Sequence, residues 1–264
     1  MAGESKTRTA RDYIPAAVFL VAVVVMWEVL VRITNTPNWL LPAPSRIIAA
    51  LWQTKELLIT HTVPTVIEAT LGLVIGVAIG VLVGIAVSQF TLFRRAVYPL
   101  LIALQTVPTM SLAPLLVVWF GYGMLPKVLL VVLVVFYPVA VSTVQGLEAV
   151  DRKLVNLLRT MGATDLQIYL KVRIPGALPA IYGGMKVGAT YTVISAIVGE
   201  WMGASRGLGI YLLRATNSYL TDRVFAGIVA IALLSVSLFG IVALTQRLAM
   251  PWYFRQQKQR EETV

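Results

Sequence analysis

The chain has 264 residues, of which 58% are hydrophobic, and its formal net charge is +10. That hydrophobic share exceeds the roughly 45–50% of soluble domains, so the composition excludes an ordinary soluble protein and predicts one integral membrane domain. Cysteine is absent, which excludes disulfides, iron–sulfur clusters and thiolate chemistry, and the single His61 cannot build a histidine metal site.

Six apolar segments are long enough to cross a bilayer as helices. They cover residues 13–33, 63–88, 98–120, 128–150, 180–202 and 224–248. The first is too long and too uniformly apolar for a signal-peptide core, so we expect it to remain as an uncleaved helix. The sequence therefore predicts an all-α integral membrane protein, with a transmembrane domain over 13–248 between polar tails at 1–12 and 249–264.

The distribution of Lys and Arg predicts the orientation of these spans. With both tails in the cytoplasm, the cytoplasmic segments hold more basic residues than the outer segments, as the positive-inside rule requires. We therefore expect a multi-pass protein of the cell membrane in contact with the lipid bilayer. The same distribution accounts for the net positive charge without a nucleic-acid partner.

The segment 35–62 is predicted to lie outside the membrane. Pro37, Pro42 and Pro44 favour an extended start. Ser45 is then expected to cap a helix that lies flat on the outer surface. A simple interfacial linker is the alternative, and the residue pattern leaves both open.

Four glycines of the second span recur every four residues and form one smooth stripe. They are Gly72, Gly76, Gly80 and Gly84. Such a stripe lets another helix approach closely. We favour packing inside the same domain, with a homodimer contact as the alternative.

The third span cannot be a regular helix throughout, because Pro99, Pro108 and Pro114 interrupt it. Gln105 and Ser111 add polarity at membrane depth. Irregular backbone is tolerated there only where it faces protein or a water-filled cavity. We therefore expect this span to line a translocation pathway, with a kinked packing helix as the alternative.

A polar stretch at 151–179, which we call the handle, separates the fourth and fifth spans. Apolar residues at i, i+3, i+4 and i+7 predict a short helix with one apolar face: Leu154, Leu157, Leu158 and Met161. Gly162 is expected to end this helix, and Thr164 with Gln167 predicts a capping box for a second one. Pro175 and Pro179 are expected to close the segment. The alternative is an ordinary loop on the membrane surface.

The handle resembles the cytoplasmic "EAA" loop of ATP-binding-cassette importer permeases. Gly162 is followed by nine residues and then by Val172, Arg173, Ile174 and Pro175, as in that loop. Asn156, Leu157 and Leu158 stand where the family has its Glu-Ala-Ala triplet, a departure typical of the branch that imports sulfonates, taurine and nitrate. Further similar motifs are Leu41–Ser45, Trp119–Gly123, Gly199–Gly203 and Gly207–Gly209, so the resemblance covers about Trp39 to Trp252.

This resemblance implies a type I importer permease that forms a homodimer around one pathway. An ATP-binding cassette subunit would dock on each handle, and an extracytoplasmic solute-binding protein would deliver the solute. Lys153 and Arg159 would meet carboxylates of the ATPase, while the apolar face would fill a groove in it. The predicted ATPase-coupling residues are Lys153, Leu157, Leu158, Arg159, Met161, Gly162, Ala163, Leu166, Ile174 and Pro175.

The resemblance also implies that the third and fifth spans face each other across the pathway. Glu200 would then stand near an outer gate, and an interfacial carboxylate is the alternative reading of that residue. The predicted pathway residues are Pro108, Thr109, Ser111, Pro114, Trp119, Tyr191, Ser195, Glu200 and Trp201.

The sequence lacks the motifs of several enzyme classes. There is no G-x-x-x-x-G-K-[ST], no H-E-x-x-H and no G-x-S-x-G, so we expect no catalytic residue, no metal and no cofactor here, with ATP bound by the partner subunit. The carboxylates within the spans lie near their ends and are unpaired in sequence, which argues against a proton-driven carrier. A stand-alone secondary transporter nevertheless remains the alternative class, ahead of a membrane enzyme or scaffold.

The solute is predicted from the aromatic residues near the proposed path. They are Trp119, Tyr122, Tyr191 and Trp201, and no Lys or Arg falls at mid-membrane in the third or fifth span. This favours an uncharged heteroaromatic solute such as riboflavin or a thiamine pyrimidine precursor. Sulfonate, taurine, nitrate or a similar small anion is the alternative.

Overall fold

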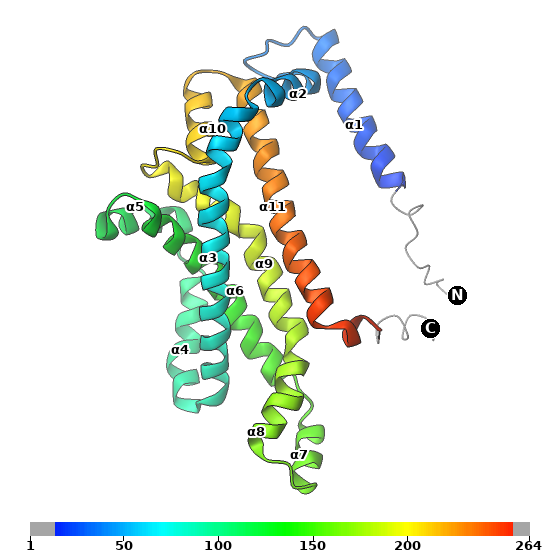
Figure 1. The fold of residues 1–264 in the computed structure, drawn as a ribbon, viewed down its shortest axis with the longest axis vertical. Coiled ribbons are helices and arrows are strands. Elements are labelled where there is room, and N and C mark those ends of the chain that lie inside the picture. The colour runs from blue at the N-terminus through cyan, green and yellow to red at the C-terminus, as the bar shows by residue number, and fades with distance from the viewer. Residues whose placement is uncertain (1–13, 256–264) are drawn as a thin grey trace.

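A computed structural model describes residues 14–255, and every regular element in that part of the chain is a helix (Figure 1). The elements are α1 (Ile14–Ile33), α2 (Pro44–Gln53), α3 (Lys55–Gln89), α4 (Thr91–Leu104), α5 (Thr109–Phe120), α6 (Met124–Glu148), α7 (Arg152–Thr160), α8 (Asp165–Ile168), the π-helical turn η2 (Tyr169–Arg173), α9 (Ile174–Trp201), α10 (Leu208–Asn217) and α11 (Thr221–Ala249). The predicted tail at 1–12 and most of the tail at 249–264 lie outside the described residues.

The predicted six-span, all-α membrane architecture is confirmed. Five stretches are long and apolar enough to cross a membrane, namely α1, α3, α6, the continuous helix Asp165–Trp201 and α11. The third span is the exception, since it is divided into α4 and α5, which are bent by 105° relative to each other. Figure 1 shows α5 projecting sideways from the body, while α7 and α8 form one end of the molecule and α2 and α10 lie at the other.

The packed centre of the domain consists of α3, α6 and α9, with α6 between the other two. The glycine stripe of α3 faces α6 of the same chain. A Cβ atom on Gly76 would lie 2.8 Å from the Cβ of Val135, and one on Gly80 would lie 2.8 Å from the Cβ of Val139. Any side chain at these positions would force the two helices apart, so the stripe sets the distance between α3 and α6.

The third span begins earlier than the sequence predicts. The sequence placed the start of this span at residue 98, but α4 begins at Thr91, directly after the single non-helical residue Phe90. The basic residues Arg94 and Arg95 therefore lie on the helix rather than before it. Arg94 forms an ion pair of 3.0 Å with Glu148 at the end of α6, which allows a charged residue to sit on the first turn of this helix.

The prediction that Ser45 caps the outer helix is wrong. Ala43 is the N-cap residue of α2 and Pro44 occupies its first turn, where a missing N–H has no cost. The Ser45 backbone N–H donates to Glu28 Oε2 at 3.0 Å, and the Ser45 hydroxyl donates to Glu28 Oε1 at 2.8 Å. Ser45 therefore ties α2 to the end of α1 rather than capping its own helix.

The first half of the handle folds as predicted. The Asp151 side chain caps α7 by accepting a hydrogen bond of 2.8 Å from the Lys153 N–H. Gly162 has a φ of +84°, a conformation that suits glycine, and it ends the first helix. The capping box is confirmed, since the Gln167 N–H donates to the Thr164 hydroxyl and the Thr164 N–H donates to the Gln167 side chain.

The predicted proline exit of the handle is wrong. Pro175 lies in the first turn of α9 and Pro179 lies inside that helix, so α8, η2 and α9 form one continuous helix from Asp165 to Trp201. The π-helical turn η2 ends at Arg173, two residues before Pro175. Such a local adjustment of the hydrogen-bond ladder accommodates residues without an N–H inside a membrane helix.

Candidate pathway and coupling surface

The tip of the handle exposes an apolar surface. Leu157 is 56% exposed, Met161 is 73% exposed and Leu166 is 66% exposed, whereas Val155 on the opposite side of α7 is buried. These side chains lie at the end of the molecule formed by α7 and α8 (Figure 1). Exposed apolar side chains clustered at a polar end of a protein mark an interaction surface.

The other predicted coupling residues fall into two groups. Lys153, Arg159 and Gly162 are exposed beside the apolar tip, and Leu158 and Ala163 are half-buried there. Ile174 and Pro175 are also half-buried, but they lie in the first turn of α9 at the base of the handle. These last two residues therefore belong to the joint between handle and membrane domain rather than to the tip.

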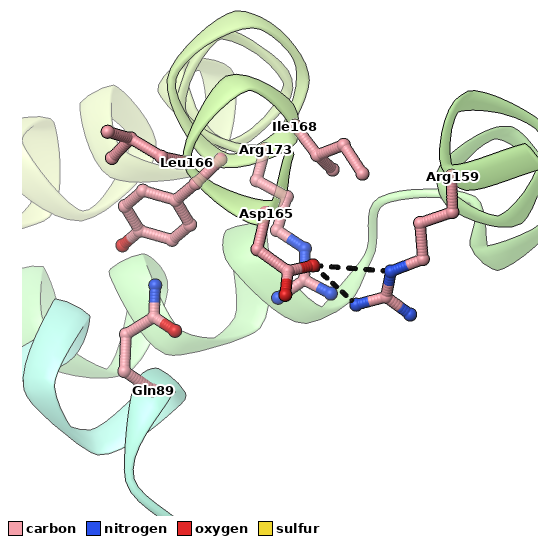
Figure 2. Close-up of a pocket in the computed structure, with 7 residues that line it drawn as sticks. Gln89, Arg159, Asp165, Leu166, Ile168 and Arg173 are labelled. Atoms are coloured by element: carbon pink, nitrogen blue, oxygen red, sulfur yellow. Dashed lines mark hydrogen bonds and ion pairs between the residues drawn. The ribbon is translucent and has the colours of Figure 1, made fainter. Parts of the chain in front are cut away.

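Arg159 has an intramolecular partner that the sequence analysis missed. Its Nε and guanidinium NH2 groups donate to the same Asp165 oxygen at 3.2 and 2.9 Å, as Figure 2 shows. The pair joins the end of α7 to the start of α8 across the Gly162 turn. Both side chains are exposed, so the ion pair orients the two helices more than it stabilises the fold.

A mainly apolar pocket of about 380 Å³ lies at the break of the third span. Gln105 and Thr109, at the two ends of the break, contribute to its wall, and Tyr137 and Tyr191 contribute from α6 and α9. The Tyr137 hydroxyl donates a 2.5 Å hydrogen bond to Gln105 Oε1. Tyr137 was not among the predicted pathway residues, because nothing in the local sequence of α6 distinguishes it from a packing residue.

The predicted pathway residues do not share one surface. Thr109 and Tyr191 line the pocket at the break. The remaining residues of the third span are exposed on α5 outside it: Pro108, Ser111, Pro114 and Trp119. Ser195 and Glu200, by contrast, are buried in the protein interior, so the structure does not place Glu200 on an open face. Trp201 is partly exposed, and its indole N–H donates to the Gly209 carbonyl at 3.1 Å.

Glu200 instead organises the outer end of the domain. Its carboxylate accepts hydrogen bonds of 2.5 Å from the Thr65 hydroxyl and from the Gly209 N–H. A Cβ atom on Gly207 would overlap this carboxylate, which explains why glycine stands there. The carboxylate lies at the N-terminus of α10, where unpaired N–H groups favour a negative charge.

Two more buried polar contacts surround Glu200. Glu68 of α3 forms an ion pair with Lys127 of α6, with side-chain exposures of 2% and 12%. His61 of α3 is buried, and its Nδ1 lies 2.9 Å from the Gly207 carbonyl oxygen. Glu68, which is unpaired in the sequence, is thus paired in the fold. Its partner is remote in the sequence and could not be recognised from spacing.

The features together define a class of protein: a helical membrane permease with a broken central span and an exposed docking handle. Residues 76–249 match the family described as binding-protein-dependent transport system inner membrane component, and the chain belongs to this family. It is thus a multi-pass permease of ATP-binding-cassette importers, located in the bacterial inner membrane.

Three relatives support this assignment. The chain is 35% identical to the formylaminopyrimidine transport permease protein ThiX of Halalkalibacterium halodurans, over 90% of this chain and 95% of that protein. It is 34% identical to the riboflavin transport system permease protein RibX of Chloroflexus aurantiacus, over 89% of this chain and 88% of that protein. It is 30% identical to a putative aliphatic sulfonates transport permease protein of Bacillus subtilis, over 87% of this chain and 84% of that protein.

The likeness to a solved structure concerns the fold alone. A chain of the inward-facing MetNI methionine ABC transporter superposes with a TM-score of 0.59 at 20% sequence identity. The match covers 73% of this chain and 97% of that chain. The predicted type I importer permease architecture is therefore confirmed.

Proposed function

We propose that this permease imports an uncharged heteroaromatic solute of the pyrimidine or flavin type. Two relatives with at least 34% identity are named for formylaminopyrimidine and riboflavin transport. The pocket at the break of the third span supports the same class, because Tyr137 and Tyr191 offer aromatic surface while Gln105 offers a hydrogen-bonding amide. Import of a small sulfonate is the second candidate, favoured by the relative from Bacillus subtilis.

The proposal includes two kinds of partner that the chain itself lacks. An ATP-binding cassette subunit docks on each handle and binds the ATP, and an extracytoplasmic binding protein delivers the solute to the outer end. Two copies of the chain form the pathway between them. The apolar tip of the handle supports the first of these contacts, since Leu157, Met161 and Leu166 are exposed where a soluble partner can reach them.

The observation that carries the mechanism is the continuous helix from Asp165 to Trp201, which has 37 residues. A displacement of the handle by the ATPase passes directly into α9, because no loop separates them. In the proposed cycle, closure of the two ATPase subunits draws the two handles together. The same movement turns α9 against the broken third span and switches access to the pathway from inside to outside.

Tight packing makes α6 follow α9 in this movement. A Cβ atom on Gly146 would lie 2.8 Å from the Cβ of Ala180, so the two helices touch near the base of the handle. The pocket lies between α6, α9 and the α4–α5 break, and Tyr191 belongs to α9 itself. A rotation of α9 therefore changes the pocket wall without any separate linkage.

The test is solute-stimulated ATP hydrolysis by the reconstituted complex. The chain is co-purified with the ATPase and binding protein encoded beside it, and challenged with a formylaminopyrimidine, riboflavin, an aliphatic sulfonate and nitrate. Stimulation by the loaded binding protein with a pyrimidine or flavin supports the proposal. Stimulation by sulfonate alone assigns the second candidate. Transport by the chain without any ATPase would establish a secondary transporter and overturn the coupling mechanism.

A further inference from the structure

Two adjoining cavities of about 360 and 500 Å³ lie at the base of the handle. Residues of the α3–α4 corner, the end of α6, α7 and η2 surround them. Arg159 and Arg173 line both, so we treat them as one site and call it the basic cavity. Figure 2 shows the part of it in which Arg159, Asp165 and Arg173 gather opposite Gln89.

The basic cavity has more positive than negative side chains. Its arginines are Arg94, Arg152, Arg159 and Arg173, and its carboxylates are Glu148 and Asp165. Arg94 pairs with Glu148 at 3.0 Å, and Arg159 pairs with Asp165 at 2.9 Å. Among residues 14–255, Arg152 and Arg173 have neither an ion pair nor a hydrogen bond from their side chains. Two positive charges therefore face the cavity without a counter-charge.

Two further features favour a ligand-binding role for this site. Arg173 is half-buried, and a charge withdrawn from water is costly unless a partner compensates it. The Tyr169 side chain lines the same cavity, and its hydroxyl is enclosed in the protein without a hydrogen-bond partner. Both residues lie on η2, and π-helical turns of this kind occur frequently at functional sites.

We propose that the basic cavity binds a phosphate group, either in the headgroup of an anionic phospholipid or as a free phosphate ion. Guanidinium groups offer paired N–H donors that match phosphate oxygens, and Arg152 and Arg173 are free to supply them. The cavity lies at the cytoplasmic end of α3, α4 and α6, where anionic headgroups are present and basic pockets between membrane helices recognise them.

A phosphate in the basic cavity would join the handle to the membrane domain. Arg152 belongs to α7, Arg173 precedes α9 and Arg94 belongs to α4. A single anion held by these groups therefore sets the angle between the handle and the cytoplasmic ends of the spans. This role concerns the orientation of the handle and does not depend on the identity of the transported solute.

The first arm of the test measures lipid binding to the purified full-length chain by native mass spectrometry. The chain is delipidated in detergent and titrated with phosphatidylglycerol or with phosphatidylcholine. The double variant R152Q/R173Q removes the two unpaired charges. The matched control R95Q/K171Q removes two exposed charges on the same side of the membrane that line neither cavity. We expect at least tenfold weaker phosphatidylglycerol binding for R152Q/R173Q and wild-type binding for the control.

The second arm replaces lipid by inorganic phosphate in detergent, at constant ionic strength with chloride as the reference. Thermal stabilisation of the wild type by phosphate, absent in R152Q/R173Q, assigns a free phosphate site if phosphatidylglycerol shows no preference in the first arm. Equal responses of wild type, R152Q/R173Q and control to both ligands would overturn the proposal. It would also be overturned if only the ATPase subunit, and neither phosphate source, protected the wild type relative to R152Q/R173Q.

Discussion

The hydroxyl of Thr65 donates a 2.5 Å hydrogen bond to Glu200 and at the same time accepts a 2.9 Å hydrogen bond from the Leu208 N–H. One side chain thereby links α3, the end of α9 and the start of α10. All of these groups are buried, so water cannot replace any of the bonds. The outer end of α9 is consequently anchored, while its inner end continues into the exposed handle.

Replacing Thr65 by valine tests this anchor. Thr65→Val keeps the shape of the side chain but leaves the Leu208 N–H without an acceptor and removes one donor from Glu200. We expect a loss of about 1–3 kcal/mol in the free energy of unfolding, seen as a lower midpoint in thermal unfolding in detergent. Thr65→Ser retains the hydroxyl and should unfold close to the wild type. An unchanged midpoint for Thr65→Val would contradict the anchoring role.

The ion pair between Glu68 and Lys127 provides a second stability test. Lys127→Met leaves a buried carboxylate without its partner, and breaking such a pair typically costs about 3–5 kcal/mol. The double variant Glu68→Gln/Lys127→Met removes both charges and should recover most of that loss. The free energy of unfolding is measured for the wild type, both single variants and the double variant, which together form a double-mutant cycle. If the double variant loses the sum of the two single effects, the residues do not interact as described.

Alanine should have different effects at Gly80 in the glycine stripe and at Gly240 in α11. A Cβ atom on Gly80 would lie 2.8 Å from both Val139 Cβ and the Phe136 carbonyl oxygen, whereas one on Gly240 in α11 meets nothing within 4 Å. Gly80→Ala should therefore destabilise the domain by about 1–3 kcal/mol through overpacking. Gly240→Ala should be neutral or stabilising by about 0.5–1 kcal/mol, because it improves helix propensity. Equal unfolding midpoints for the two variants would show that α3 does not touch α6 this closely.

Short-range residue patterns correctly predicted those features of the fold that depend on residues close together in the sequence. The capping box of Thr164 and Gln167 needs only residues three apart, and the glycine stripe is visible as a period of four. The continuation of the handle into α9 was missed, because two prolines usually end a helix and the π-helical turn that accommodates Pro175 has no simple sequence signature.

Pairing between distant segments created the features of the candidate site that the sequence could not show. Glu200 was expected near an open gate, yet its partners Thr65 and Gly209 come from α3 and α10 and enclose it. Arg159 was expected to meet carboxylates of the ATPase, and within this chain it pairs with Asp165, which follows the glycine turn. For both residues the sequence identified a charged side chain but not its neighbours, because those neighbours are brought together by tertiary packing.

The turn at Gly162 offers a test of coupling that does not depend on stability of the membrane core. Gly162 has a φ of +84°, and a Cβ atom there would meet nothing within 4 Å, so the constraint is one of backbone conformation alone. Asparagine tolerates this conformation far better than a β-branched residue does. We therefore expect Gly162→Val to reorient α7 relative to α8, whereas Gly162→Asn should preserve the turn.

The readout for these two variants compares ATP hydrolysis with solute uptake in proteoliposomes that contain the full complex. Gly162→Val should assemble with the ATPase and hydrolyse ATP, while uptake should fall at least tenfold. The reason is that the reoriented handle no longer transmits the movement of the ATPase to α9. Gly162→Asn should retain both activities. Full uptake by Gly162→Val would show that the geometry of the handle does not transmit the movement of the ATPase to α9. A loss of complex assembly in both variants would instead assign the Gly162 turn to docking, and the continuous helix would have to be tested further along α9, beyond Pro179.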